Sequence, residues 1–318
     1  TNTSTGEVVF MGIRNWTLTT ATTTIANNTI GGAAAGSITN NATATASRVL
    51  GIQTEASTPT MTGNTIRNMS MVAGNTGTIA SAAVIGINQQ ATSTAGAVVS
   101  QNTIYALSNS HATAAVWVTG LNYNGPSSGT NLIARNLIYG LTTPSTSTSA
   151  TVNGIYVQVG NTTYQNNMIA LGSDLTANSP QINGINEVGG TDNFYHNSVY
   201  IGGASVAAGS ASSFAFNSAI TSNTRAYRNN IFYNARSNGA ATGKHYAIQV
   251  GGAAANPPGL TTNNNVLYAP GTGGYTGRFN ALDQTTLANW QAATGQDANS
   301  FSADPQFLAP AAATSDLH

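Results

Sequence analysis

The carboxylates of this chain are the residues from which catalysis or metal binding would be built. A close pair would support acid–base cleavage of a glycosidic bond, and a larger set would bind Ca²⁺. The nine acids are Glu7, Glu55, Asp174, Glu187, Asp192, Asp283, Asp297, Asp304 and Asp316. They are scattered over the repeat described below, and no two take the same position in adjacent copies. We therefore expect no catalytic residue, no metal ligand and no cofactor.

Tyrosines, in contrast, recur at one position, three residues after a repeated asparagine. They are Tyr105, Tyr139, Tyr200, Tyr233 and Tyr268. We expect them on the outer face, where an apolar stripe of this extent usually contacts something. In one interpretation the rings stack on each other or lie under a loop or the C-terminal helix. In the other they form a contact surface for a neighbouring subunit or a polysaccharide.

Charged side chains are scarce, at 6% of the residues, and the formal net charge is zero. Binding of nucleic acid requires clustered Lys and Arg, and Lys244 is the only lysine, so we expect no nucleic-acid partner. There is no cysteine, which excludes disulfides and thiolate chemistry. No apolar run approaches the ~18 residues of a membrane span, so we expect no membrane insertion.

The strands that position these side chains are predicted by a sequence repeat that occurs eight times and has two halves. Its first half is Gly-Ile or a close variant, beginning at Gly12, Gly51, Gly86, Gly120, Gly154, Gly184, Ala219 and Ala247. Its second half is Asn-x-aliphatic, or Phe once, beginning at Asn28, Asn64, Asn102, Asn136, Asn167, Asn197, Asn230 and Asn265. Repeats of this length indicate stacked supersecondary units.

Apolar residues form columns when the copies are aligned, with period-2 alternation inside each short segment. This pattern, in segments rich in Gly, Thr and Asn, predicts strands rather than helices. Each coil should hold at least two short strands that pair in parallel with the next coil, about 4.8 Å away. The predicted fold is an all-β, single-stranded parallel β-helix of about eight coils.

The repeated asparagine is expected at a corner of each coil. Asn tolerates the left-handed backbone that a corner requires, and its amide can hydrogen-bond to the next coil. Residues 1–275 are assigned to the β-helix, and residues 276–318 to a short helix and an extended capping segment. Asp283 would cap that helix at its start and Gly295 would follow its end. Since neither terminus has a typical beginning or end, we expect a part of a longer chain.

The Asn-x-aliphatic coils and one tail motif carry a resemblance to a known family. The motif is Trp290…Thr294-Gly295-Gln296-Asp297…Ser300…Asp304-Pro305-Gln306-Phe307. Together they resemble secreted bacterial right-handed parallel β-helix repeat proteins of the surface or exported type, over nearly the whole chain. The resemblance implies a right-handed β-helix with an asparagine ladder, and an extracellular or cell-surface location. It implies no particular activity, because fold alone does not imply function.

We therefore expect a non-enzymatic extracellular structural or adhesive module of a larger surface or filament-forming protein. Its partners would be further copies, other cell-surface components or polysaccharide. The alternative is a β-helix protein that binds or degrades polysaccharide. A third hypothesis is ice binding, suggested by the runs at 17–20 and 22–24 and by Thr29, Thr65 and Thr103.

Overall fold

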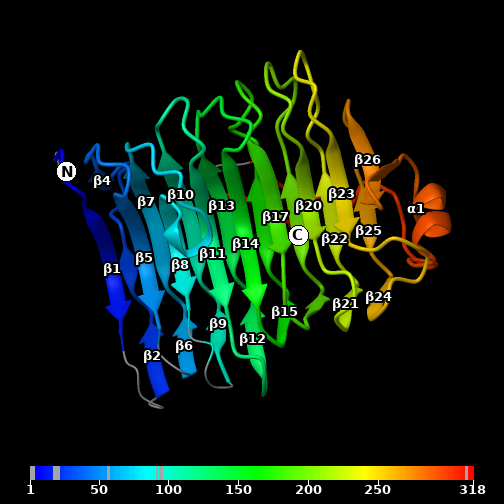
Figure 1. Cartoon of the computed structure of the whole chain (residues 1–318), viewed down its shortest axis with the longest axis horizontal. Coiled ribbons are helices and arrows are strands. Elements are labelled where there is room, and N and C mark those ends of the chain that lie inside the picture. Colours follow the sequence, from blue (N-terminus) through cyan, green and yellow to red (C-terminus); the bar gives the residue numbers. More distant parts are fainter. Residues whose placement is uncertain (1–3, 17–21, 56–57, 91, 93–95, 312–313) are drawn as a thin grey trace.

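The chain forms a parallel β-solenoid of about seven turns, with three sheets along its length and one short helix at its C-terminal end (Figure 1). The computed structural model describes residues 4–16, 22–55, 58–90, 92, 96–311 and 314–318. We number the sheets in the order in which the chain visits them within a turn. The C-terminus returns to the middle of the rod rather than ending beyond the helix.

The first sheet contains the Gly-Ile segments. Its strands are β1 (Val9–Asn15), β5 (Arg48–Thr54), β8 (Val84–Gln89), β11 (Trp117–Asn124), β14 (Thr151–Val159), β17 (Gln181–Glu187), β20 (Ser213–Ser218), β23 (His245–Val250), β26 (Gly274–Phe279) and β27 (Leu282–Gln284). All neighbours are parallel except β26 and β27. A 3₁₀ turn (Ile79–Ser81) precedes β8.

The third sheet contains the segments after the repeated asparagine. Its strands are β3 (Thr29–Ile30), β7 (Thr65–Met71), β10 (Thr103–Asn109), β13 (Leu137–Thr142), β16 (Met168–Leu171), β19 (Ser198–Ile201), β22 (Ile231–Asn234) and β25 (Val266–Tyr268), and β4 (Ile38–Asn40) also pairs with β7. The predicted apolar columns are confirmed: Ile52 pairs with Ile87, and Ile66 pairs with Ile104.

A second sheet lies between these two, so each turn has three strands. Its members are β2 (Thr22–Ala26), β6 (Thr58–Thr62), β9 (Val98–Ser100), β12 (Asn131–Ala134), β15 (Thr162–Gln165), β18 (Asn193–Tyr195), β21 (Arg225–Arg228) and β24 (Leu260–Asn263). One core column runs through it, three residues before each repeated asparagine. Its aliphatic side chains give way to rings toward the C-terminal end, where Tyr164 and Phe194 stack with centroids 4.5 Å apart.

The asparagine ladder is present and continuous from Asn28 to Asn265. Each side-chain amide donates to the side-chain oxygen of the next Asn, at 2.9–3.1 Å. The backbone N–H of Asn167, for example, donates to the same oxygen of Asn197, at 3.1 Å. The side chain of Asn167 also donates to the carbonyl of Ile133. Apart from Asn28, which is half-buried, every ladder amide thereby satisfies polar groups of two coils in a buried place.

The left-handed corner residue is not the ladder asparagine itself, which corrects the expectation from the sequence. Positive φ falls one residue earlier, as at Asn27, Arg135 and His196, with values of 55–57°. The ladder side chain must point inward to reach the next coil, so the preceding residue makes the turn. This is why several residue types occupy the corner while the ladder position stays Asn.

A helix and a buried tryptophan close the C-terminal end of the core. Helix α1 spans Leu287–Thr294 and ends at Gly295 in the left-handed region, as expected. Its cap is Thr286, not Asp283, because the Thr286 hydroxyl accepts from the N–H of Asn289. Trp290 is fully buried, and its indole N–H donates to Asp297 at 2.9 Å. No helix of the described residues is long and apolar enough to cross a membrane.

Replacing a middle ladder residue tests this account. Asn167→Ala should lower the free energy of unfolding by about 3 kcal/mol, because it leaves buried polar partners in two neighbouring coils unsatisfied. Asn161→Ala, on an exposed position of the same coil, is the matched control and should change it by less than about 0.5 kcal/mol. Equal midpoints for the two variants in urea would contradict the role given to the ladder.

Candidate binding groove on the third sheet

The predicted tyrosines form one column on the third sheet, but the column is interrupted. In register it reads Arg67, Tyr105, Tyr139, Ala170, Tyr200, Tyr233 and Tyr268. The rings of Tyr105 and Tyr139 are parallel, 4.9 Å apart. Tyr233 lies 5.3 Å from Tyr200 and 5.2 Å from Tyr268. The rings therefore contact each other from coil to coil in two groups, the first stacked and the second edge-to-face or tilted, with a gap at Ala170.

The C-terminal segment, which we call the strap (described residues 302–311 and 314–318), lies over this column. Phe307 packs against Tyr200 and Tyr233, with ring centroids 6.5 and 6.2 Å apart. Leu317 is buried against Tyr139 and Ala170, in the gap that the small side chain leaves. The strap, rather than α1 or a loop, thus covers part of the stripe. Sequence analysis missed it because its two apolar anchors follow no repeat.

The strap is held in shape by its own backbone. Ala309 and Asp316 form an antiparallel bridge with two hydrogen bonds of 3.0 Å. The N–H of Leu308 donates to the carbonyl of His318 at 3.1 Å. These bonds bring Phe307 and Leu317 to the same side of the strap, toward the sheet.

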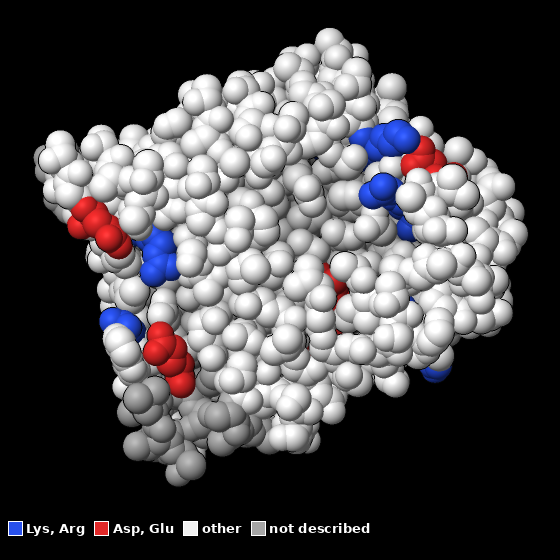
Figure 2. All heavy atoms as spheres, in the orientation of Figure 1, with Lys and Arg blue, Asp and Glu red and all other residues white. Residues whose placement is uncertain are grey.

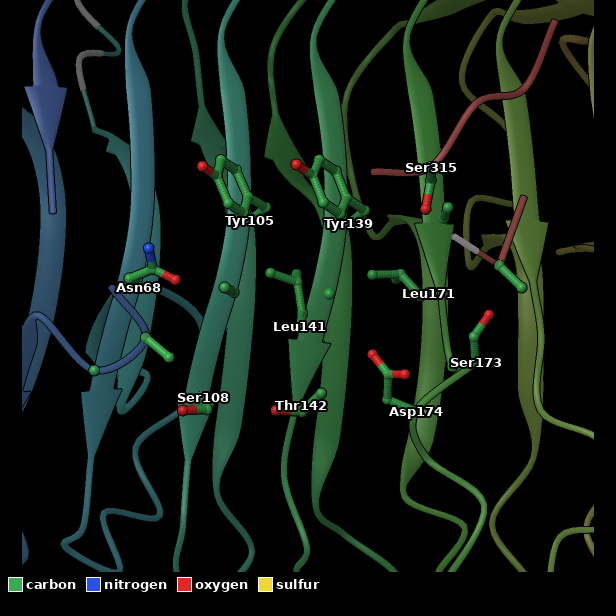
Figure 3. A pocket seen from close by; sticks show the side chains of 17 residues that line it. Asn68, Tyr105, Ser108, Tyr139, Leu141, Thr142, Leu171, Ser173, Asp174 and Ser315 are labelled. Carbon is green, nitrogen blue, oxygen red and sulfur yellow. The ribbon is translucent and has the colours of Figure 1, made fainter. Parts of the chain in front are cut away.

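A groove of about 460 Å³ opens beside the strap (Figure 3). The stacked rings of Tyr105 and Tyr139 line one side of it, and Ser315 of the strap lies at its rim. A row of polar side chains faces the rings across the floor. It consists of Ser108, Thr142, Ser173 and Asp174.

The backbone between the rings and the hydroxyl row is bent. Asn68, Ala106 and Gly140 occupy equivalent places in three coils and all have positive φ, between 52 and 62°. This bend lets Ser108 and Thr142, which pair in register, face outward together with the tyrosines. The groove therefore combines aromatic surface, hydroxyl groups and one carboxylate, which is hydrogen-bonding and stacking chemistry.

The electrostatics of the stripe favour neutral phenols. Partial burial raises the pKa of Tyr139, and burial with the neighbouring Asp304 raises that of Tyr233 to about 12. Asp174 is the single carboxylate among the groove-lining residues. Within the described residues, no group of three or more His, Cys, Asp or Glu side chains is placed to hold a metal ion.

Exposed charges are sparse, and Figure 2 shows that most of the first-sheet side of the rod carries none. They gather mainly near the two ends of the solenoid. At the C-terminal end Asp283 accepts hydrogen bonds from Lys244 and from Tyr246, at 2.5 and 2.7 Å. The carboxylate of Asp283 is therefore bound to side chains on the outer face of the first sheet, which explains why it does not cap α1.

Two acids meet in the interior, although the sequence indicated that the acids scatter. Glu187 ends β17 and Asp192 precedes β18, and both are fully buried. Glu187 accepts from the hydroxyl of Tyr227 at 2.5 Å, and Asp192 accepts from the N–H of Thr162 at 2.9 Å. Burial raises the pKa of Glu187 to about 7, and burial together with the charge of Glu187 raises that of Asp192 to about 9.

His245 is a satisfied core residue. Its ring lies 2.9 Å from the Ser213 hydroxyl and 2.9 Å from the side-chain oxygen of Asn238. Burial, and then the charge of Arg236, lower its pKa to about 4. A neutral imidazole with both nitrogens bonded has a structural role in this core.

Removing the ring of Phe307 should release the strap without unfolding the solenoid. Phe307→Ala loses the aromatic contacts with Tyr200 and Tyr233, so limited proteolysis should cut the strap about tenfold faster. The unfolding midpoint of the core should stay within the error of measurement. Leu308→Ala, on a side chain that is 75% exposed, is the control and should leave the cleavage rate unchanged.

The buried carboxyls predict a loss of stability in alkaline solution. Both folded-state pKa values exceed the usual 4.5 and 3.8, so the folded chain binds more protons than the unfolded chain. Their contribution to the free energy of unfolding should therefore fall as pH rises from 7 to 9 in metal-free buffer. His245 is neutral over this range and does not interfere.

Urea midpoints at pH 7, 8 and 9 test this dependence. Asp192→Asn should flatten it, whereas Asp174→Asn in the exposed groove should not. A wild-type midpoint that rises with pH over this interval would contradict the burial of ionisable carboxyls.

No protein-family profile, curated protein or solved structure matches this chain. Its function therefore has to be inferred from the solenoid and from the chemistry of its surface.

Proposed function

We propose that the chain is a non-enzymatic, extracellular structural or adhesive module of a larger surface or filament-forming protein. In this proposal the groove on the third sheet is its contact surface for a polysaccharide. The resemblance to secreted bacterial β-helix repeat proteins supports the location, and the sparse charge supports close packing with other components.

The chemistry of the groove carries the proposal. A sugar presents apolar C–H faces and hydroxyl groups, and the groove offers both kinds of partner. Tyr105 and Tyr139 supply aromatic surface with a polar tip, while Ser108 and Thr142 supply a row of donors and acceptors. Because these side chains come from successive coils, they repeat about every 4.8 Å along the rod. A periodic surface of this kind suits a chain of sugars.

The groove does not have the carboxylate pair that cleavage of a glycosidic bond requires. Retaining and inverting glycosidases place two carboxyls roughly 5 to 9.5 Å apart across the bond. Asp174 stands alone among the groove-lining residues, and Glu187 and Asp192 are buried in the core. Binding without cleavage is therefore the favoured activity.

Filament formation is supported by the edges of the sheets. Within the described residues, the three sheets begin at β1, β2 and β3, each with a partner on one side. Unpaired strand edges of this kind template further strands. The N-terminal face is thus suited to continuation of the solenoid, whereas α1 blocks the other end.

The register disfavours ice binding. Thr29, Thr65 and Thr103 pair in one column, but the next residues are Leu137 and Met168. A flat threonine surface therefore stops after three coils. The run at 17–20 lies outside the described residues.

Substitution of the stacked tyrosines tests the proposal. The double variant Tyr105→Ala/Tyr139→Ala should weaken binding to whichever polysaccharide is retained on a glycan array by at least about tenfold, because it removes the aromatic side of the groove. Tyr195→Ala, on the second sheet, is the control and should bind like the natural chain. Absence of binding to every glycan, or equal binding by both variants, would refute the groove as a polysaccharide site.

A further inference from the structure

A polar cluster is enclosed at the corner where the first sheet ends and the second begins. On the first sheet Tyr123, Val157, Glu187 and Ser218 share a column at this corner. On the second sheet Asn131 pairs with Thr162. In the next two coils Asn193 pairs with Ala226, so the residues directly before them, Asp192 and Arg225, continue the same column. Tyr164 and Tyr227 lie two residues further along. The coil register thus collects polar side chains from four turns inside the rod.

Five oxygen atoms at this corner make no hydrogen bond of normal length and angle among the described residues, although the Thr162 hydroxyl lies close enough to those of Tyr123 and Tyr164 to influence their pKa values. They are Oε1 of Glu187, Oδ2 of Asp192, Oγ1 of Thr162 and the hydroxyl oxygens of Tyr123 and Tyr164. The residues that carry them are at most 1% exposed. Buried polar atoms in native proteins are nearly always paired, and a group of unpaired ones indicates a bound water or ion.

The backbone positions beside these oxygens are occupied by glycine. Gly125, Gly160 and Gly190 occupy the corner in three successive turns. A Cβ at Gly190 would lie 2.1 Å from Oδ2 of Asp192, one at Gly160 would lie 2.9 Å from Oγ1 of Thr162, and one at Gly125 would lie 2.3 Å from the hydroxyl of Tyr123. Glycine is therefore required at each place, and three of the five unpaired oxygens depend on it.

The corner also has an excess of negative charge when both acids are ionised. Arg225 is the buried cation nearest to them in the register, but its guanidinium donates to backbone carbonyls. Its bonds to Asn223, Ile220 and Pro258 measure 2.7–3.0 Å, and none reaches a carboxylate. The Nε of Arg225 has no hydrogen-bond partner among the described residues either. When both acids are ionised, two buried carboxylates face one guanidinium, and either a bound cation or protonation would offset the excess charge.

We propose that this corner binds a divalent cation that prefers oxygen ligands, with Ca²⁺ as the natural candidate. Glu187 and Asp192 supply charge, and the hydroxyls of Thr162, Tyr123 and Tyr164 supply neutral oxygens. All five unpaired atoms of these residues are oxygens, which suits Ca²⁺ rather than a nitrogen- or sulfur-preferring metal. The cation would join three successive turns of the solenoid from within, independently of the groove.

The rival to the cation is a proton. The raised pKa values of Glu187 and Asp192 describe the corner without metal, where protonation removes the excess charge. Occupation by Ca²⁺ would instead require both carboxyls to be ionised. At alkaline pH, Ca²⁺ should therefore raise the unfolding temperature if the corner binds a cation and should leave it unchanged if the corner binds only protons.

Terbium luminescence distinguishes them. The full chain is unfolded in urea with a chelator, refolded at pH 8 with Tb³⁺ and excited where tyrosine absorbs. Tyr123 and Tyr164 should sensitise emission that saturates at one Tb³⁺ per chain and is lost when excess Ca²⁺ is present during refolding. Asp192→Asn and Glu187→Gln should each weaken the signal at least tenfold, whereas Asp174→Asn and Asp304→Asn should retain it.

Thermal unfolding of the natural chain keeps the proposal testable if a variant does not fold. At pH 8, millimolar Ca²⁺ should raise the unfolding temperature above that in chelator, and at pH 5 the increase should be much smaller. Equal unfolding temperatures with Ca²⁺ and with chelator at pH 8 would overturn the cation site. Sensitised emission that survives in Asp192→Asn would overturn its location.

Discussion

One column of hydrogen-bonded asparagine amides sets the stacking on which the rest of the molecule depends. At every corner the chain turns through a left-handed residue, and the next side chain must satisfy the backbone of its own coil and of the neighbouring coils. The amide of Asn does this because it has a donor and an acceptor on one short stem. At the C-terminal end the ladder passes to Asp297 and Ser300, and Trp290 closes the core.

Because the ladder keeps coils in register, chemistry in this fold is arranged as columns. The same register that aligns Ile66 with Ile104 aligns Tyr105 with Tyr139 on the outer face of the third sheet. A single different residue in a column therefore changes the surface at that coil alone. Ala170 interrupts the tyrosine column and leaves space, which Leu317 fills. The strap and the groove are consequences of that interruption.

Repetition determined what the sequence could predict. The columns beginning at Gly51 and at Asn64 recur at similar spacing, so two of the three sheets and the ladder could be recognised. The second sheet was missed, because its strands are three to five residues long and its core column ranges from Ile25 to Thr262. The strap follows no period, and the meeting of Glu187 with Asp192 depends on the tightness of a corner that sequence spacing does not describe.

Hydrogen exchange at the ladder asparagines tests the central claim most directly. The backbone N–H groups of Asn64, Asn102, Asn136, Asn167 and Asn197 lie at corners, yet each donates to a buried side-chain oxygen at 3.0–3.1 Å. If the ladder holds the coils together, these amides exchange as slowly as those of the central strands and open only with the whole solenoid. Exchange at the rate of exposed loop amides, such as those at 253–255, would contradict it.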